Sequence, residues 1–180
     1  TDVAKGAADI VLTDDNFSSI VGAVEEGRRQ YDNIQKFVRY LLSSNVGEML
    51  AIAGNIILGG PLILLPVQIL WMNLVTDGIT AIALGLEPAE RSVMQRPPRD
   101  PRARILDATG LIWIVTVGTY MGGVCLFLFE WYRNSGVEIL RAQTVAFTAL
   151  IVVEKANVLN FRSLRDSLTR LRPASNPWVY

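Results

Sequence analysis

The sequence predicts a mainly α, polytopic membrane protein with four transmembrane helices. Hydrophobic residues make up 51% of the 180-residue chain, and its mean hydropathy is positive. These residues gather in four segments, each near the length of about 20 residues that a helix needs to cross a bilayer. The four segments are 41–58, 62–84, 111–129 and 144–161.

Arginine and lysine residues predict the orientation of these segments. They cluster in 18–40, in the loop 86–108 and in 162–176, whereas the connection between the first two segments carries no charge. Because positively charged loops stay in the cytoplasm, we expect these three regions to be cytoplasmic parts of an integral, multi-pass protein. The four-helix transmembrane region would then be 41–172. Three prolines in 96–101 preclude a regular helix within the loop.

One long helix is predicted from about Ser18 into the first apolar segment, because apolar residues recur at helical spacings without an interrupting proline. Its first part, 18–40, would be a cytoplasmic stalk. The preceding 1–17 includes "AADIVLTDD", which is typical of a short buried strand at the C-terminal end of an α/β domain. Residues 173–180 would start a further, truncated membrane helix. We therefore expect the chain to be part of a longer protein.

Composition excludes several classes of function. The formal net charge is zero and there is no histidine, which argues against a basic nucleic-acid-binding surface and against histidine-based metal or acid–base chemistry. The single cysteine, Cys125, lies in an apolar segment and has no second cysteine with which to form a disulfide. We therefore expect membrane lipid around the chain, no nucleic-acid partner, and no catalytic or cofactor-binding residue.

Polar residues inside the apolar segments form the candidate site. Glu48 and Asp77 are acids at membrane depth, where unpaired carboxylates cost several kcal/mol unless they are protonated or balanced by a cation. Amides and a hydroxyl lie three or four residues from them, on the same helix faces, or directly beside them. Oxygen atoms of these kinds are ligands for a hard cation such as calcium. The predicted cation ligands are Asn45, Glu48, Asn73, Thr76, Asp77 and Glu154.

Structural alternatives remain open for several of these positions. Asn73 and Thr76 are equally compatible with hydrogen bonding between membrane helices. Glu154 is followed by Lys155 near the cytoplasmic end of its segment, where a lysine can extend to the interface. Two glycines next to the acids are compatible either with close helix packing or with local unwinding that frees carbonyl ligands: Gly47 and Gly78.

Six stretches of the sequence carry a family resemblance: "TDVAKGAADIVLTDDNFSSIV", "RYLLSSNVGE", "PVQILWMNLVTDG", "ALGLEPAE", "VMQRPPR" and "VVEKANVLN". Together they resemble the C-terminal part of a P-type cation-transporting ATPase of the calcium-pumping class, similar to the sarco/endoplasmic reticulum pump and its prokaryotic relatives. The resemblance covers nearly the whole chain. It implies that the first block closes the phosphorylation domain and that the four segments are the fifth to eighth of ten membrane helices.

The resemblance also implies roles for individual residues. One calcium site would use Asn45, Glu48, Thr76, Asp77 and Glu154. Asn73 and Asp77 would contribute to a second site, which also needs a helix that this sequence does not contain. Having both Asn73 and Glu48 is similar to the two-site calcium class, although manganese or another divalent ion fits the same oxygen ligands.

Two positions depart from the family pattern. Thr80 stands where the family often has proline, which bears on how far the second segment unwinds. Lys155 stands beside a predicted ligand, where its ammonium group could act as a built-in positive charge and reduce the number of ions carried.

The resulting functional prediction is the ion-translocating C-terminal part of an ATP-driven calcium pump. The enzyme would be the full-length translocase, and ATP and magnesium would bind only in its remaining domains, which this chain lacks. The alternative is a truncated or regulatory four-helix membrane module that binds cations or a partner without ATP turnover. A passive channel is disfavoured because no repeated ring of pore-lining residues is visible.

Overall fold

The computed structural model describes residues 2–14, 16–100, 102–164 and 175–179. Within them the chain is mainly helical and has no strand. Most of the predicted cytoplasmic segment 162–176 lies outside the described residues, as does part of 173–180. The helical elements are α1 (Asp2–Ala7), α2 (Ser18–Ile57), α3 (Pro66–Trp71), the π-helix η1 (Met72–Thr76), α4 (Asp77–Gly85), the 3-10 helix η2 (Val93–Gln95), α5 (Ala108–Asn134), α6 (Ile139–Phe161) and the 3-10 helix η5 (Pro177–Val179).

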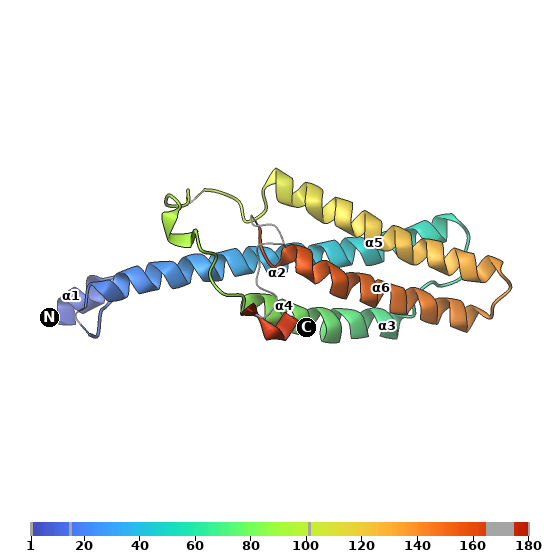
Figure 1. Ribbon diagram of the computed structural model, residues 1–180, viewed down its shortest axis with the longest axis horizontal. Coiled ribbons are helices and arrows are strands. Elements are labelled where there is room, and N and C mark those ends of the chain that lie inside the picture. Colours follow the sequence, from blue (N-terminus) through green and yellow to red (C-terminus); the bar gives the residue numbers. More distant parts are fainter. Residues whose placement is uncertain (1, 15, 101, 165–174, 180) are drawn as a thin grey trace.

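Helix α2 is continuous over 40 residues, as its uninterrupted apolar periodicity predicts. Its start is fixed by polar side chains, because the first amides of a helix have no partner within it. Asn16 accepts from the amide of Ser18 at 3.0 Å, and Asp14 accepts from the hydroxyl of Ser19 at 2.6 Å. The N-terminal part of α2 extends beyond the other helices as a single arm (Figure 1).

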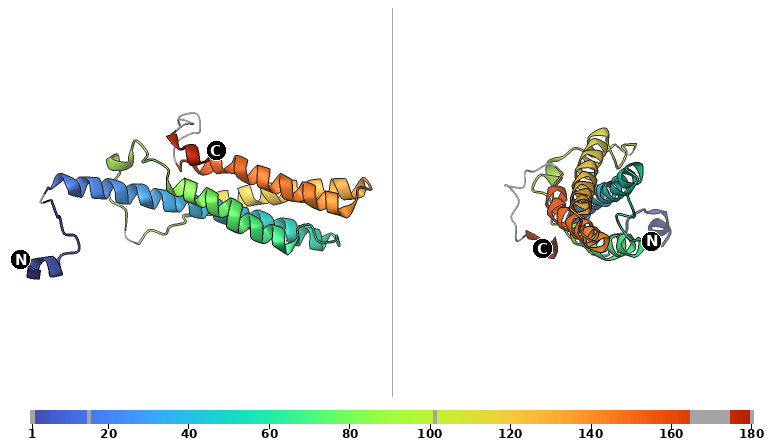
Figure 2. Two further views of the ribbon diagram at one scale, coloured as in Figure 1. Left: turned by 90° about the horizontal axis from the view of Figure 1, so that it is seen from below. Right: turned by 90° about the vertical axis from the view of Figure 1, so that its right-hand side faces the viewer.

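Four helical rods lie side by side and alternate in direction: α2, the rod formed by α3, η1 and α4, then α5 and α6 (Figures 1 and 2). Glycines allow α2 and α5 to approach closely. A Cβ atom on Gly122 would lie 2.5 Å from the carbonyl oxygen of Gly47, and one on Gly47 would lie 3.1 Å from the Cβ of Met121. Gly47 therefore serves close helix packing, one of the two roles that the sequence left open.

Three helical stretches are long and apolar enough to cross a membrane: 66–85, 108–134 and 139–161. The protein is therefore a membrane protein. Among the described residues, the predicted span 41–58 is not one of these stretches. Helix α2 ends at Ile57, and polar residues including Asn45, Glu48 and Asn55 lie among the apolar residues of this part. The second stretch begins at Pro66 rather than at Leu62, since proline favours the first turn of a helix.

The predicted strand within "AADIVLTDD" is wrong. Helix α1 ends at Ala7, and residues 8–14 are irregular. Ile10 is 69% exposed and Val11 is 45% exposed, so the apolar pair is not buried. A strand needs a neighbouring strand for its backbone hydrogen bonds, and the described residues contain none.

The described residues of the loop between α4 and α5 are irregular apart from η2, including Pro97 and Pro98, as predicted. The loop runs alongside α2 and is held there by side chains of that helix (Figure 1). Arg28 donates to the carbonyl oxygens of Val93, at 2.9 Å, and Arg96, at 2.7 Å. Gln35 donates to the carbonyl oxygen of Ile105 at 2.8 Å. The loop therefore has a fixed shape against the arm of α2.

Candidate functional site

Three acidic side chains from three helices lie in the interior of the bundle, and we call them the acidic site. Glu48 on α2 is 5% exposed, whereas Asp77 at the start of α4 and Glu154 on α6 are fully buried. Their charges lie near enough to interact with one another. Among the described residues, however, no three Asp, Glu, His or Cys side chains are gathered tightly enough to enclose a metal ion by themselves.

The contact between Glu48 and Asn73 joins α2 to η1. The amide nitrogen of Asn73 donates to Oε2 of Glu48 at 2.9 Å and to the carbonyl oxygen of Ile69 at 3.0 Å. The other carboxylate oxygen of Glu48, Oε1, is buried and accepts no hydrogen bond. One oxygen of Glu48 is therefore held in place and the other is free.

Asp77 has the same half-paired arrangement. Its Oδ1 accepts from the hydroxyl of Tyr40 at 2.9 Å, whereas its Oδ2 is buried without a hydrogen bond. The hydroxyl of Ser44 lies beside Asp77 and is also buried without a hydrogen bond. The sequence analysis missed Tyr40 and Ser44. Their spacing could have revealed them, because Tyr40, Ser44 and Glu48 follow at intervals of four residues on one face of α2.

A π-helical turn, Met72–Thr76, directly precedes Asp77. Such single turns are frequent at functional sites, because the extra residue rotates the side chains that follow. The hydroxyl of Thr76 donates to the carbonyl oxygen of Met72 at 2.7 Å, and that of Thr80 donates to the carbonyl oxygen of Thr76 at 2.7 Å. The second segment is therefore widened at this point rather than unwound.

The two residues that depart from the family pattern, Thr80 and Lys155, contact each other in the structure. The ammonium nitrogen of Lys155 donates to the carbonyl oxygen of Thr76 at 2.7 Å and also to the hydroxyl of Thr80. Lys155 therefore reaches from α6 to the turn before Asp77 and does not extend along its own helix to the interface. Its neighbour Glu154 has both carboxylate oxygens buried without a hydrogen bond.

Asn45 is the one predicted ligand that the structure leaves apart from the acids. Its side chain is exposed and donates to the carbonyl oxygen of Leu41, on its own helix, at 2.8 Å. Glu48, three residues later, is buried. Residues three apart on a helix differ in direction by about 60°, so the edge of the buried face falls between them.

The acidic site carries excess negative charge. Among the described residues, three carboxylates face one ammonium group, that of Lys155, so the formal charges sum to −2. Four buried carboxylate oxygens accept no hydrogen bond, one on Glu48, one on Asp77 and two on Glu154. Buried ionised groups of this kind are costly unless they are paired, and hard cations prefer oxygen ligands. The arrangement is therefore suited to binding a cation.

A second group of buried charges lies where the loop 86–108 meets α2 and the end of α6, and we call it the ionic cluster. Arg96 pairs with Asp32 and with Glu90, and Lys36 lies 3.9 Å from Glu90. Arg162 and Glu87 are 2.8 Å apart and almost fully buried. The six members are Asp32, Lys36, Glu87, Glu90, Arg96 and Arg162.

Neutral groups add hydrogen bonds to the acids of the ionic cluster. Ser163 donates to Glu90 at 2.8 Å, and Asn176 donates to Glu87 at 2.7 Å. Burial by itself would raise the pKa of Glu90, but Ser163, Lys36 and Arg96 together lower it below its usual value. Burial lowers the pKa of Lys36, and Glu90 is the main group that opposes this shift. The cluster is therefore a set of mutually stabilised ions.

Comparison with known proteins supports the same conclusion. Residues 61–180 match the family described as "Cation transporting ATPase, C-terminus". The calcium-transporting ATPase of Bacillus subtilis (strain 168) is 46% identical over 173 residues, which are 94% of this chain and 19% of that protein. The chain thus spans about a fifth of the length of this relative. By the family match and by this identity, the resemblance read from the sequence motifs is confirmed, and the chain belongs to the C-terminal region of the cation-transporting ATPase family.

Proposed function

We propose that this chain is the ion-translocating C-terminal part of an ATP-driven calcium pump. The observation that carries the proposal is the acidic site, in which three buried acids from three helices leave four carboxylate oxygens without a hydrogen bond. A purely structural role would require those acids to be protonated or would leave their charges uncompensated in the interior of the bundle. A divalent cation would compensate the formal charge of −2.

Glu48, Asp77 and Glu154 would be the principal ligands in this proposal. Asn73 and Tyr40 hold one oxygen each of Glu48 and Asp77, and thereby aim the second oxygen of each acid inward. The backbone oxygen of Thr76 already accepts a hydrogen bond from the ammonium group of Lys155. Asn45 would have to turn away from Leu41 to reach the ion, so we assign it to the ion-bound state only.

Calcium is the proposed ion for two reasons. The candidate ligands are all oxygens, which favours a hard cation over zinc or copper. The relative from Bacillus subtilis is described as a calcium-transporting ATPase.

The proposed topology places four helices across the membrane. The part of α2 from 41 to 57 lies alongside three qualifying helical stretches, and its buried polar residues face the bundle. It would therefore cross with them despite its lower hydropathy. The arm 18–40, the loop 86–108 and 162–176 would be cytoplasmic because they carry the positive charge.

The remaining domains of a full-length pump would bind ATP and magnesium and accept the phosphoryl group. Residues 1–17 would close the phosphorylation domain, and the arm of α2 would be the stalk that links this domain to the acidic site. Coupling over such a distance needs an element that spans both sites, and α2 is continuous over 40 residues.

Calcium-dependent phosphorylation by ATP tests the proposal in the full-length protein. We expect Glu48→Gln and Asp77→Asn each to raise the calcium concentration for half-maximal phosphorylation by roughly 100-fold, because each loses about 3 kcal/mol of charge-assisted coordination. Glu130→Gln is the matched control, since Glu130 pairs with Arg133 outside the acidic site. Unchanged calcium dependence in both site variants would refute the proposal. Calcium binding without any phosphorylated intermediate would favour the four-helix module.

A further inference from the structure

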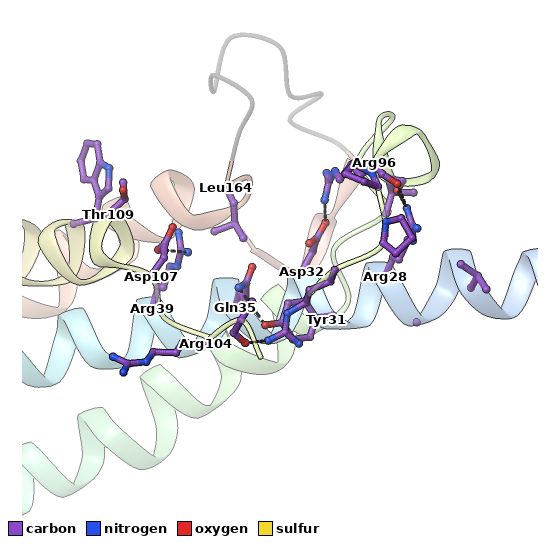
Figure 3. Close-up of a pocket in the computed structure, with 18 residues that line it drawn as sticks. Arg28, Tyr31, Asp32, Gln35, Arg39, Arg96, Arg104, Asp107, Thr109 and Leu164 are labelled. Atoms are coloured by element: carbon purple, nitrogen blue, oxygen red, sulfur yellow. Dashed lines mark hydrogen bonds and ion pairs between the residues drawn. The ribbon is translucent and has the colours of Figure 1, made fainter. Parts of the chain in front are cut away.

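A cavity of about 750 Å³ lies between α2, the loop before α5 and the first turns of α5 (Figure 3). It shares no lining residue with the acidic site. One end is lined by Thr109 and Trp113, on the first turns of a helix long enough to cross a membrane. The cavity therefore opens close to the proposed boundary between the cytoplasm and the bilayer.

The charge lining this cavity is strongly positive. Five arginines and two carboxylates face it, so the formal sum is +3: Arg28, Arg39, Arg96, Arg99 and Arg104 against Asp32 and Asp107. Each of the two carboxylates forms an ion pair with one arginine. Asp32 pairs with Arg96, and Asp107 lies 3.0 Å from Arg39 while also accepting from the amide of Gly110 at 2.8 Å.

Three arginines of the cavity have no carboxylate partner in the part of the chain that the structure describes. Arg28 donates to two backbone oxygens of the loop. The guanidinium of Arg99 lies over the ring of Tyr31, with its carbon 4.2 Å from the ring centroid. Arg104 is exposed and forms no ion pair or hydrogen bond among the described residues. Arg39 contributes a further donor, its buried Nε, which has no acceptor.

We propose that this cavity binds the phosphate group of an anionic ligand, carried either by a phospholipid headgroup at the membrane surface or by a soluble phosphate ester. Guanidinium groups present paired donors that match phosphate oxygens. Backbone contacts hold Arg28 and the aromatic ring holds Arg99, so these two charges are positioned before a ligand arrives. Arg104 is free to close over the ligand, and Trp113 offers an apolar ring to a neighbouring acyl chain.

The positions of the charges distinguish the cavity from an ordinary solvated surface. Arginines on a solvated surface extend outward, and their exposed ion pairs contribute little. Here two of the arginines lie on α2 and three on the loop, and they line one concave space (Figure 3). Arg28, Arg39 and Arg96 are partly buried there, whereas Arg99 and Arg104 are exposed at its edge. The third carboxylate nearby, Glu90, is already used by Lys36 and Arg96 in the ionic cluster. The excess positive charge therefore remains for a ligand.

Binding of three probes to the full-length protein in detergent tests the proposal. The probes are short-chain phosphatidylglycerol, glycerol 3-phosphate and short-chain phosphatidylcholine. Titration calorimetry measures the affinity of the protein for each probe. We expect phosphatidylglycerol to bind, and the double substitution Arg99→Gln with Arg104→Gln to weaken its binding about tenfold. Arg102→Gln removes one positive charge from the same loop outside the cavity, which matches Arg104→Gln alone, and should change binding less than twofold.

The probes also identify the source of the phosphate. Binding of phosphatidylglycerol alone assigns the cavity to a lipid headgroup, and binding of glycerol 3-phosphate as well assigns it to the phosphate group itself. The proposal is overturned if neither anionic probe binds, if phosphatidylcholine binds equally well, or if Arg102→Gln weakens binding as much as the double substitution. Arg104→Gln alone, at an exposed side chain without a partner, should give an intermediate loss and is not expected to affect folding.

Discussion

The ionic cluster and the acidic site are both buried groups of charges, yet only the ionic cluster is balanced in formal charge. In the ionic cluster three acids face three bases, and their formal charges sum to zero. In the acidic site three acids face only Lys155, and four carboxylate oxygens have no hydrogen bond. The first group is therefore balanced in charge within the described residues, whereas the second carries excess negative charge there, which a bound cation would offset under the proposed function.

The comparison shows what buried charge can reveal about function. Desolvated ions within a protein are normally paired, so a paired cluster is consistent with a purely structural role. An unpaired set on three different helices is costly unless its acids are protonated or a cation balances them. Helix α2 carries members of both groups, since Lys36 and Glu48 are 12 residues apart, or about 18 Å along the helix.

Breaking α2 should have the largest effect, because it interrupts the arm that would link the phosphorylation domain to the acidic site. Ile34→Pro loses a backbone hydrogen bond and kinks the helix, at about 3 kcal/mol, without changing a predicted ligand. In the full-length pump we expect calcium binding and phosphorylation to remain and vesicular calcium uptake to be lost. Ile34→Ala keeps the helix and is the control. Normal uptake by the proline variant would show that α2 is not the coupling element.

Neutralising an acid of the ionic cluster should destabilise the protein. Glu90→Gln leaves Lys36 buried without its carboxylate partner, and breaking such a pair costs about 3 kcal/mol. We expect a lower midpoint of thermal unfolding, with calcium affinity unchanged in the protein that remains folded. Glu25→Gln, on the exposed arm of α2, is the control. An unchanged midpoint in Glu90→Gln would mean that the cluster is not a structural anchor.

Neutralising an acid of the acidic site should have the opposite effect on stability: when no cation is present, it should stabilise the protein. Both oxygens of Glu154 are buried and unpaired, so Glu154→Gln removes an uncompensated charge and should stabilise the cation-free protein by about 1–2 kcal/mol. The added stability from calcium should fall at the same time. Thermal unfolding in the presence of a calcium chelator measures the first effect. Destabilisation there would place Glu154 among the paired, structural acids.

Removing the ammonium group of Lys155 should have the smallest effect. Lys155→Met takes a positive charge away from the turn beside Asp77, and we expect calcium affinity to rise about tenfold or a further ion to bind. Thr80→Val removes one acceptor of this ammonium group but keeps its charge, and it should change affinity much less. Equal equilibrium binding by Lys155→Met and the unsubstituted protein would show that Lys155 does not act on the ion.

The sequence predicted the positions of the helices better than it predicted which side chains contact each other between helices. Apolar periodicity without proline gave α2, and clustered apolar residues gave the other three rods. The family resemblance was confirmed by comparison. The spacing of Asn73 and Asp77 placed them on one face, but the partner of each, Glu48 and Tyr40, depends on how the helices pack. Periodicity fixes the face of a helix and leaves its facing neighbour open.

Three features could not be read from the sequence for identifiable physical reasons. The direction of Asn45 depends on a local hydrogen bond to Leu41 that competes with any tertiary contact. Lys155 reaches a carbonyl oxygen that is presented by a neighbouring helix, next to a π-turn which no simple residue pattern marks. The ionic cluster joins three separate segments of the chain, so its charges resemble ordinary surface charges in the sequence until the fold brings them together.

Equilibrium binding of calcium to the full-length protein tests the difference between the two groups most directly. The measurement compares the unsubstituted protein with Asp77→Asn in the acidic site and Glu90→Gln in the ionic cluster, each checked for folding. We predict that Asp77→Asn loses calcium binding at concentrations that saturate the unsubstituted protein, whereas folded Glu90→Gln binds normally. Normal binding by Asp77→Asn, or equal loss in both variants, would contradict the assignment of the acidic site as the place where the cation binds.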